Sequence, residues 1–569
     1  MNEQRNLILA VVLSALVLVG WGLVSQHYFP PSTKVVNGKQ VPVTKPESNP
    51  IANGATAVRD RKIVLAEAPR VAIATPRLAG SINLKGARID DLVLTQQRQT
   101  IDRNSPPVRL LSPAGTPDAY FAGFGWTGEG TILPGPDTVW TPSGNQLAPN
   151  TPVTLSWDNG HGQLFQIRLS VDDGYMFQVD QRIANHGAGA VAARPYALVS
   201  RATATKDPST WTQHVGPVGV FDGAANYKFN YKNITEDGDQ HFSTNGGWIG
   251  FSDKYWLTAV IPNQSSAVDA AFRRGPSGSF QADFSPPPAI VPPGRALGYQ
   301  SLFFAGAKEV ELLNRYQNQL GVAKFDKAID WGWFEWFMKP IFMLLRWLYA
   351  QIGNFGVAII CLTLIIRGLM FPIAQKQFKS MASMRTLQPK IAALQERHKD
   401  DKPRLQQETL KLYQEEKVNP IAGCLPVVLQ IPVFYALYKV LSVSVEMRHK
   451  PFVLWLHDLS APDPLTPINL FGYLPFNPPS ILHLGVLPIL LGVTMWYQMR
   501  LNPPPPDPVQ KQMFALMPWM MMFFFAPLAA GLQLYYVCNN LFTIAQQTFL
   551  YSRHPGMRAA AATAAKPPK

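Results

Sequence analysis

Arg367 is the residue whose surroundings most restrict its chemistry, because it lies in an apolar stretch, 352–374, long enough to cross a bilayer. An arginine at membrane depth costs several kcal/mol unless it is solvated, and such residues usually face a protein interior or a water-filled cavity. The other apolar stretches contain no Asp or Glu that could pair with it. The chemistry this indicates is attraction of an anionic group that visits the site. The alternative is an arginine that snorkels to the membrane surface.

Further polar side chains recur at helical spacing in the same apolar stretches. Thr363 lies one turn before Arg367 on the same helix face. The last apolar stretch carries a polar stripe at steps of three and four, widened by Tyr535, Asn539 and Gln546: Gln533, Tyr536, Asn540, Thr543 and Gln547. A third stretch places Gln430, Phe434 and Tyr438 at steps of four. A single polar residue can merely tie helices together, but the set beside Arg367 predicts a hydrophilic groove open to the cytoplasm.

Residue types that carry catalysis are present without the spacing that catalysis needs. His457, Asp458 and Ser460 have the types of a triad, but such close neighbours rarely reach triad geometry. The chain has no HExxH, P-loop or GxSxG motif. Its three cysteines, Cys361, Cys424 and Cys538, all lie in apolar stretches, which argues against a disulfide framework and a paired zinc site. We expect no enzymatic activity, no cofactor and no metal.

Composition places the chain among membrane proteins with a large soluble part. Its 569 residues are 47% hydrophobic and 15% charged, and the long apolar runs lie at the N-terminus and after residue 350. The net charge of +14 could indicate nucleic acid. However, many basic residues lie beside the predicted spans, and there is no recognisable nucleic-acid module. We therefore expect no sequence-specific nucleic-acid binding.

The first 350 residues divide into four predicted segments. Residues 1–25 form a transmembrane anchor, because 7–24 is an uncharged run without a small-residue cleavage site. Residues 26–60 are a flexible linker rich in Pro, Ser, Asn and Gly. Residues 61–328 alternate short β-branched and aromatic segments, such as 71–74, 164–171, 176–183 and 248–261, with turn residues, which predicts a β-sandwich domain. Residues 329–350, rich in Trp and Phe, suit an amphipathic helix at the membrane interface.

The remaining residues are predicted to form a five-helix membrane bundle with its connections. The predicted segments are transmembrane helix 2 at 351–373, a helical hairpin at 374–418, helix 3 at 419–443, an outer loop at 444–481, helix 4 at 482–499, a Pro-rich loop at 500–511, helices 5 and 6 at 512–551, and a basic tail at 552–569. Lys439, near the outer end of helix 3, is expected to snorkel or to pair with Glu446 on the same face.

The distribution of Lys and Arg sets the predicted orientation. Residues 374–418 hold ten of them and 443–481 hold two, so the first segment and the basic tail are expected in the cytoplasm. Both termini are then cytoplasmic and the β domain lies on the opposite face, the periplasm of a Gram-negative cell. Apolar residues at helical spacing, including Met381, Met384 and Leu387, predict that 374–418 is an antiparallel hairpin. It is either a solvated spacer or a surface that contacts a client through exposed methionines.

Five motifs, in order, resemble the YidC-type membrane protein insertases of Gram-negative bacteria. They are GSINLKGARIDDLVL (80–94), RGLMFPIAQKQFKSMASMRTLQPKI (367–391), VNPIAGCLPVVLQIPVFYALY (418–438), LWLHDLSAPDP (454–464) and GLQLYYVCNNLFTIAQQ (531–547). The resemblance implies that Arg367 is the family's groove arginine with Thr363 beside it. It also implies that Ile431, Phe434 and Tyr536 contact the incoming segment. The β domain would be a β-super-sandwich, similar to sugar mutarotases but without their activity.

The function that follows from these features is membrane protein insertion and chaperoning in the bacterial inner membrane. The expected partners are nascent membrane proteins, the lipid bilayer, the Sec translocon and the ribosome. The predicted groove residues are Arg367, Thr363, Gln430, Ile431, Phe434, Gln533, Tyr536 and Asn540. Two alternatives stay open: a solute transporter or channel with a cytoplasmic vestibule, and a periplasmic binding module on a membrane anchor.

Overall fold

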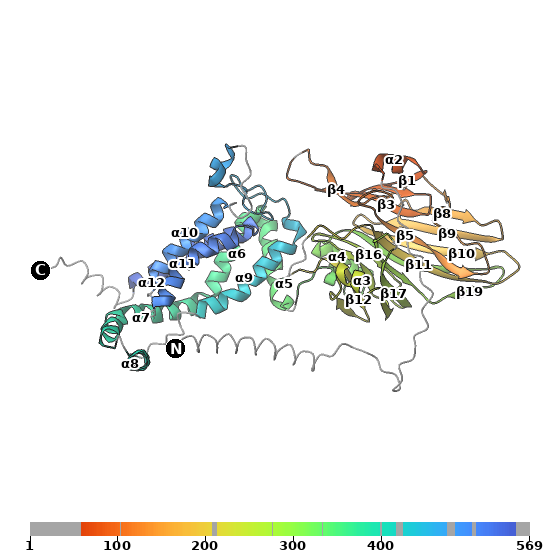
Figure 1. Cartoon of the computed structure of the whole chain (residues 1–569). Coiled ribbons are helices and arrows are strands. Elements are labelled where there is room, and N and C mark those ends of the chain that lie inside the picture. The colour runs from red at the N-terminus through yellow and green to blue at the C-terminus, as the bar shows by residue number, and fades with distance from the viewer. Residues whose placement is uncertain are drawn as a thin grey trace, which may run out of the picture. The chain divides into compact units, whose positions relative to one another are not determined.

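The computed structural model describes residues 59–553 with gaps at 103, 208–212, 276, 333, 399–400, 417–424, 475–483 and 503–507. Its helices and strands are shown in Figure 1. The predicted anchor (1–25), nearly all of the predicted linker (26–60) and nearly all of the predicted basic tail (552–569) lie outside the described residues.

The first part of the described chain folds into two sheets. The larger sheet has the order β14 (Gln240–Asn245), β17 (Ala267–Arg274), β18 (Phe280–Ser285), β11 (Val191–Arg201), β5 (Tyr120–Glu129), β3 (Arg88–Arg98), β2 (Leu78–Asn83), β1 (Arg70–Ala74) and β7 (Gln146–Leu147). In addition, β19 (Ala289–Val291) pairs with β11, and β4 (Pro107–Leu111) pairs with β3.

The second sheet has the order β13 (Ala224–Asn226), β12 (Gly216–Phe221), β15 (Trp248–Ser252), β16 (Trp256–Ile261), β20 (Arg295–Ala307), β10 (Met176–Asn185), β9 (Gln163–Val171), β8 (Val153–Asp158) and β6 (Thr141–Pro142). Its longest pairing joins β10 and β20 in antiparallel register, from Met176 opposite Phe304 to Asn185 opposite Arg295.

Alternating side chains fill the space between the two sheets. In β9, every second residue from Gln163 to Val171 is buried, as expected for a strand with one face on a core. Aromatic rings bridge the sheets: Phe124 of β5 lies 6.1 Å from Phe303 of β20, measured between ring centroids. The predicted β-sandwich is therefore confirmed. The predicted single segment 248–261 is wrong, because β15 and β16 are two antiparallel strands joined by a turn.

Three short helices accompany the sheets and a fourth follows them. The short helices are α2 (Arg61–Ala66), α3 (Tyr231–Glu236) and the 3-10 helix η1 (Phe325–Ala328). The fourth helix, α4 (Val310–Gln319), packs on the sandwich through Leu313 and Tyr316, which are buried in the same hydrophobic core.

The second part of the chain is helical. Its helices are α5 (Glu335–Ile352), α6 (Phe355–Leu369), α7 (Phe371–Arg397), α8 (Lys402–Glu415), α9 (Leu425–Val443), α10 (Val486–Leu501), α11 (Pro508–Phe525) and α12 (Ala530–Arg553), with 3-10 turns η3 (Val445–Met447) and η4 (Pro467–Gly472). Helix α12 contacts α6, α9 and α10, so these helices together can form one site (Figure 1).

Helix α5 has two chemically different faces. Met338, Ile341 and Leu345 are buried, whereas Trp336 and Trp347 are exposed. This pattern is that of an amphipathic helix. The helix begins at Glu335 and ends at Ile352, a few residues later at both ends than the predicted 329–350. Its location at a membrane interface stays a prediction.

The predicted transmembrane helix 2, 351–373, is wrong as a single helix. The structure divides it into α6 and the start of α7, with a bend of 62°. The cause is Pro372, whose ring and missing N–H do not allow α6 to continue but are tolerated in the first turn of α7. Among the described helices, none alone has the length and apolar composition of a membrane crossing, although α6 with 371–378 does as a bent pair. The membrane crossings therefore stay predictions.

Helices α7 and α8 lie in the stretch for which a helical hairpin was predicted. Leu387 and Ile391 of α7 are buried against Tyr413 of α8, and Lys390 forms an ion pair with Glu416. Asp401 caps α8 by accepting a hydrogen bond from the Arg404 N–H at 3.1 Å. The apolar seam thus joins the two helices to each other. Whether the hairpin is cytoplasmic stays a prediction.

Lys439 does not pair with Glu446, contrary to the sequence prediction. Its side chain is 1% exposed and its Nζ lies 3.5 Å from Asp330 Oδ2, in the segment before α5. Glu446 follows the end of α9 at Val443 and instead accepts hydrogen bonds from the Val310 N–H at 3.1 Å and the Ser444 hydroxyl at 2.9 Å. Because the helix ends before residue 446, the two side chains no longer share a helix face.

Candidate functional site

The candidate site forms where α6, α9 and α12 meet, with Arg367 in the last turn of α6. The Arg367 Nε donates a hydrogen bond to Asn539 Oδ1 at 2.8 Å, and Nη2 lies 3.5 Å from the Asn539 backbone oxygen. Within the described parts of the chain, no carboxylate lies within ion-pair distance of Arg367. The Asn539 amide satisfies one donor of the guanidinium but does not neutralise its charge.

This contact refines the expectation that only water or a visiting group would satisfy Arg367. The sequence placed Asn539 on the margin of the polar stripe and did not identify it as the partner. The signal was present, since Asn539 lies one residue before the predicted Asn540. The rotation of α12 that brings Asn539, rather than Asn540, to Arg367 depends on tertiary packing.

A second polar contact joins α9 to α12 near Arg367. Gln430 Nε2 donates a hydrogen bond to the hydroxyl of Tyr535, which is buried in the helical core. Gln430 is thus held by a residue that the sequence placed only at the edge of the stripe. Together, Arg367–Asn539 and Gln430–Tyr535 connect all three helices with uncharged partners.

Thr363 is buried one turn before Arg367, but its hydroxyl is not directed at a ligand. It donates to the Ile359 carbonyl of its own helix at 2.7 Å. Thr543 of α12 does the same to the Asn539 carbonyl at 2.6 Å. Such bonds satisfy a hydroxyl inside an apolar helix. Thr363 therefore places a small side chain on this helix face, and its hydroxyl donor is already used within α6.

The predicted stripe on α12 divides into residues with different contacts. Gln533 is fully buried, and its Nε2 donates to the carbonyls of Phe525, Ala526 and Leu528 at 2.9, 3.2 and 2.8 Å. It therefore closes the turn between α11 and α12. Asn540 Nδ2 donates to Thr494 Oγ1 of α10 at 3.2 Å. Both contacts tie helices together, which is the alternative that the sequence left open for single polar residues.

An aromatic cluster borders the polar contacts. Tyr536 lies 5.4 Å from Phe434 and 4.6 Å from Phe525, between ring centroids, and Phe434 stacks on Tyr438 at 6.1 Å. Ile431, one helical turn before Phe434, is 58% exposed. The structure therefore brings Phe434 and Tyr536 together and leaves Ile431 accessible. Phe525 was not selected from the sequence, because nothing in the local pattern distinguishes it from its neighbouring phenylalanines.

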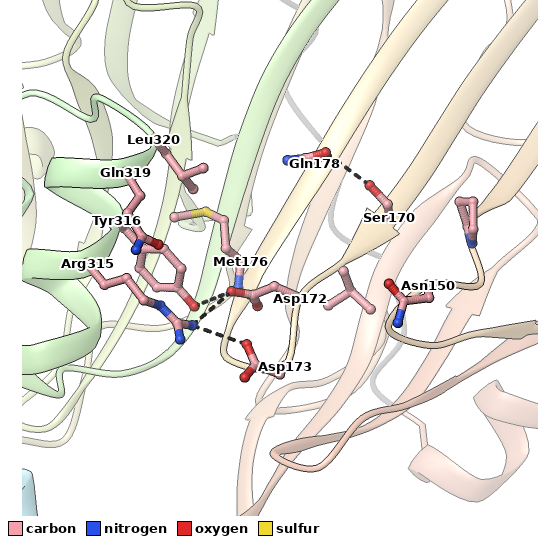
Figure 2. A pocket seen from close by; sticks show the side chains of 12 residues that line it. Asn150, Ser170, Asp172, Asp173, Met176, Gln178, Arg315, Tyr316, Gln319 and Leu320 are labelled. Atoms are coloured by element: carbon pink, nitrogen blue, oxygen red, sulfur yellow. Dashed lines mark hydrogen bonds and ion pairs between the residues drawn. The ribbon is translucent and has the colours of Figure 1, made fainter.

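A pocket on the β domain is a second place where a ligand could bind. Figure 2 shows the hairpin between β9 and β10 facing α4, with Asp172, Asp173, Arg315 and Tyr316 at one end. Asp172 accepts a hydrogen bond from the Tyr316 hydroxyl at 2.7 Å, and Arg315 lies 3.2 Å from Asp173. Because Arg315 already pairs with both carboxylates, the pocket offers no unpaired cation to an anionic ligand.

The described residues contain no group of three or more His, Cys, Asp or Glu side chains placed to hold a metal ion. The candidate site itself consists of a guanidinium, amides, hydroxyls and aromatic rings. Such a set can attract, orient and release a chain, and it has no nucleophile with an adjacent base.

Two family models match successive parts of the chain. The model described as "YidC periplasmic domain" matches residues 70–344, and the model described as "60Kd inner membrane protein" matches residues 347–557. A relative from Zymomonas mobilis, named "Membrane protein insertase YidC", is 49% identical over 97% of this chain and 96% of its own length. A relative of the same name from Rhizobium johnstonii is 42% identical over the same shares of the two chains.

Among solved structures, the chain is similar to one titled "Active YidC insertase crystal structure with the first transmembrane domain resolved". The sequence identity is 18% and the TM-score is 0.37, over 84% of this chain and 92% of the other. A putative aldose 1-epimerase from Escherichia coli K12 aligns at 7% identity and a TM-score of 0.27, over 42% of this chain and 98% of its own.

Proposed function

The chain belongs to the YidC family of membrane protein insertases, and on that premise we propose that it inserts inner-membrane proteins through a groove between α6, α9 and α12. The substrate is a nascent membrane protein and the site of action is the lipid bilayer. The proposal of a groove rests on a single observation: Arg367 is a partly buried cation that is held by an amide and not by a carboxylate.

In the proposed mechanism, Arg367 receives the acidic residues of a client's short outer segment. Asn539 orients the guanidinium by holding Nε, while Nη1 has no partner among the described residues. An incoming carboxylate can pair with Arg367 without displacing a resident one. The interaction is strengthened by the low-dielectric surroundings, and it shortens the apolar distance that the polar segment must cross.

The aromatic cluster is proposed to guide the client's apolar segment into lipid. Phe434 and Tyr536 present rings beside the polar contacts, and Ile431 offers exposed apolar surface on the same helix as Phe434. The client's own hydrophobicity supplies the driving force for release. No nucleotide is needed for this step. The aromatic rings give apolar contact without fixing one sequence, as a handler of many clients requires.

The other predicted groove residues have supporting roles. Gln430 and Tyr535 connect α9 to α12, Gln533 holds the turn between α11 and α12, and Asn540 ties α12 to α10. Thr363 provides a small side chain on the face of α6 beside Arg367. We propose that these residues maintain the shape of the groove, while Arg367, Ile431, Phe434 and Tyr536 contact the client.

The topology and partners belong to the same proposal. The α7–α8 hairpin, the basic tail and the N-terminus are cytoplasmic, and the β domain is periplasmic, as the distribution of Lys and Arg favours. The protein acts alone or with the Sec translocon, receives clients from the ribosome, and assists their folding as a chaperone. Transport of a solute is not favoured, because the predicted spans contain no Asp or Glu.

Site-specific photocrosslinking tests the groove. A crosslinking residue at position 367 or 536 should capture a stalled nascent single-span protein, and the product should fade once the client is released. Ile290, which is exposed on β19 of the β domain, is the control and should not capture the stalled client. Capture from neither groove position, with the protein correctly inserted, would return Arg367 to the snorkelling interpretation.

A deletion distinguishes the insertase from a binding module. Removal of residues 61–320 should leave client insertion by the helical part. Loss of insertion while α5–α12 remain folded would instead make the β domain the working part.

A further inference from the structure

An exposed apolar segment lies in the loop between α9 and α10, and the proposed mechanism does not use it. The segment 467–474, called here the outer loop tip, begins with η4. Its exposed side chains are Ile468, Leu470, Phe471, Tyr473 and Leu474. Tyr473 is 88% exposed. Water is an unfavourable environment for so many neighbouring apolar side chains.

The base of this loop is fixed to the start of α10. The buried Asp463 accepts hydrogen bonds from the Trp455 indole N–H at 2.9 Å and the Leu487 N–H at 2.7 Å. The Val486 N–H donates to the Leu465 carbonyl at 3.0 Å. Since Leu487 lies in the first turn of α10, the outer loop tip must project close to the outer end of that helix.

The backbone of the outer loop tip turns so that its apolar side chains point outward. Leu470 and Phe471 both adopt left-handed conformations, with φ of 50° and 59°, which non-glycine residues rarely adopt. The Phe471 N–H donates to the Thr466 carbonyl at 2.9 Å, and the Leu474 N–H donates to the Asn469 carbonyl at 3.1 Å. These bonds hold an unfavourable conformation that buries none of the five side chains.

The charge pattern matches a lipid environment rather than water. The chain contains no Lys, Arg, Asp or Glu between Asp463 and Arg500. Leu490 and Val493 are also exposed, on a helix that is predicted to cross the bilayer. Aromatic side chains at the end of such a helix are typical of the interface between lipid and water.

We propose that the outer loop tip inserts Leu470, Phe471 and Tyr473 into the surface of the outer leaflet beside α10. The proposal rests on the proposed function, because it requires α10 to cross the inner membrane. The loop then acts as a lateral anchor that sets the depth of the outer end of α10. Asp463 transmits that depth to the helix through its hydrogen bond to Leu487.

Depth-dependent fluorescence quenching tests the anchor on the purified full-length chain. Cys361, Cys424 and Cys538 are replaced by serine, Tyr473→Cys is introduced and labelled with an environment-sensitive dye, and the protein is placed in phosphatidylcholine–phosphatidylglycerol vesicles. Nitroxide-labelled lipids report contact with the bilayer, and iodide reports contact with water. The matched control is Ile290→Cys on β19, which is exposed to a similar extent, 72%, but lies on the β domain.

The expected result is strong quenching at position 473 by lipids with a shallow nitroxide and weak quenching by iodide, with the reverse at position 290. Equal iodide quenching at both positions would overturn the proposal. Shielding of position 473 from both quenchers would also overturn it, because protein would then cover the loop. Client insertion assayed in the same vesicles keeps the two proposals separate: lipid quenching without insertion counts against the proposed function alone.

Discussion

Buried arginines in the β domain and Arg367 in the helical part are held in opposite ways. Among the described residues of the β domain, three arginines have less than a tenth of their surface exposed: Arg194, Arg201 and Arg273. Each has a carboxylate partner: Asp269 at 2.8 Å, Asp253 at 3.0 Å and Asp283 at 2.9 Å. Arg367 has the amide of Asn539 instead.

The difference separates a structural role from a receptive one. A buried ion pair is closed to new partners, because an incoming anion must displace a carboxylate that is already desolvated. A guanidinium held by an amide keeps its full charge for an incoming anion. The β domain therefore uses its buried arginines to hold strands together, whereas α6 keeps one available.

Two buried lysines show that the kind of partner does not follow the division of the chain into two parts. Lys439 of α9 is buried and paired with Asp330. A buried cation in the helical part can therefore have a carboxylate partner, as the buried arginines of the β domain do. Lys308, in the β domain, donates to the Ser252 hydroxyl at 2.9 Å and to the Asp253 carbonyl at 2.7 Å, and no carboxylate in the described chain lies within ion-pair distance of it. What differs is therefore the partner of each buried cation, a carboxylate or an uncharged group, and not only the part of the chain in which the cation lies.

The largest expected effect comes from removing the carboxylate of a buried ion pair in the β domain. Asp283→Ala leaves Arg273 buried with only the more distant carboxylate of Asp239, at 3.6 Å, and should lower the free energy of unfolding by about 3 kcal/mol. Thermal unfolding of the full chain in detergent measures the change. The control is Asp137→Ala, which removes the partner of Lys85 at the surface and should leave the transition where it is. Equal effects of both changes would contradict the assignment of a structural pair.

The second effect concerns the function of Arg367, which is held by an amide and not by a carboxylate. Arg367→Gln keeps an amide that can reach Asn539 but removes the charge. Insertion of clients with acidic outer segments should fall roughly tenfold, the equivalent of about 1.4 kcal/mol, which is close to the low end for a hydrogen bond to a charged group. Stability in detergent should change little, because no carboxylate among the described residues depends on Arg367.

Two controls sharpen this prediction. A client with a neutral outer segment should insert as well with Arg367→Gln as with the natural chain. Arg367→Glu should impair acidic clients further, since it adds repulsion. Normal insertion of acidic clients by Arg367→Glu would remove the attraction from the mechanism.

Removing the carboxylate of the buried Lys439–Asp330 pair in the helical part should give a smaller loss of stability. Asp330→Asn leaves the Lys439 ammonium buried with an amide neighbour, and we expect the helical part to lose about 1–3 kcal/mol, since Asp330 is partly exposed to water. Lys439→Met in the same chain should recover the part of that loss that is due to the buried charge, whereas the hydrogen bonds that Asp330 accepts from the His214 and Gly332 N–H groups set the remainder. If the double variant unfolds as early as Asp330→Asn alone, the pair does not explain the loss.

The smallest expected effect is the pH dependence due to Lys308. Burial lowers the pKa of Lys308 from its usual 10.5 to about 8. Between about pH 8 and pH 10.5 the unfolded chain binds a proton that the folded chain does not, so stability should rise with pH across that range. Below pH 8 both forms are protonated, and the cost of burying the charge is fully present.

The variant Lys308→Met isolates that contribution. It should flatten the rise in unfolding temperature between pH 8 and pH 10, and it should be at least as stable as the natural chain at pH 7, because Ser252 retains the Asp253 carbonyl as a partner. An unchanged slope would assign the pH dependence to other groups.

Periodicity made some of these features predictable. Alternation of apolar residues, as in β9, and turn residues between strands were sufficient for the β-sandwich, because one buried face imposes a period of two. They were not sufficient for the turn between β15 and β16, where the apolar run continues across the hairpin. Likewise, the apolar content of 351–373 did not reveal the bend before Phe371, which depends on Pro372.

By itself, the sequence determined that Arg367 lies in an apolar helix without an acidic neighbour, and that polar and aromatic residues follow one another at helical spacing in two other helices. Those are properties of residue type and period, which are local. Only the tertiary structure decided that Asn539 holds Arg367, that Gln533 and Asn540 serve helix contacts, and that Lys439 pairs with Asp330 rather than Glu446. The reason is that a few tens of degrees of helix rotation, or one early helix end, changes which neighbour a side chain meets, and packing between distant segments sets both.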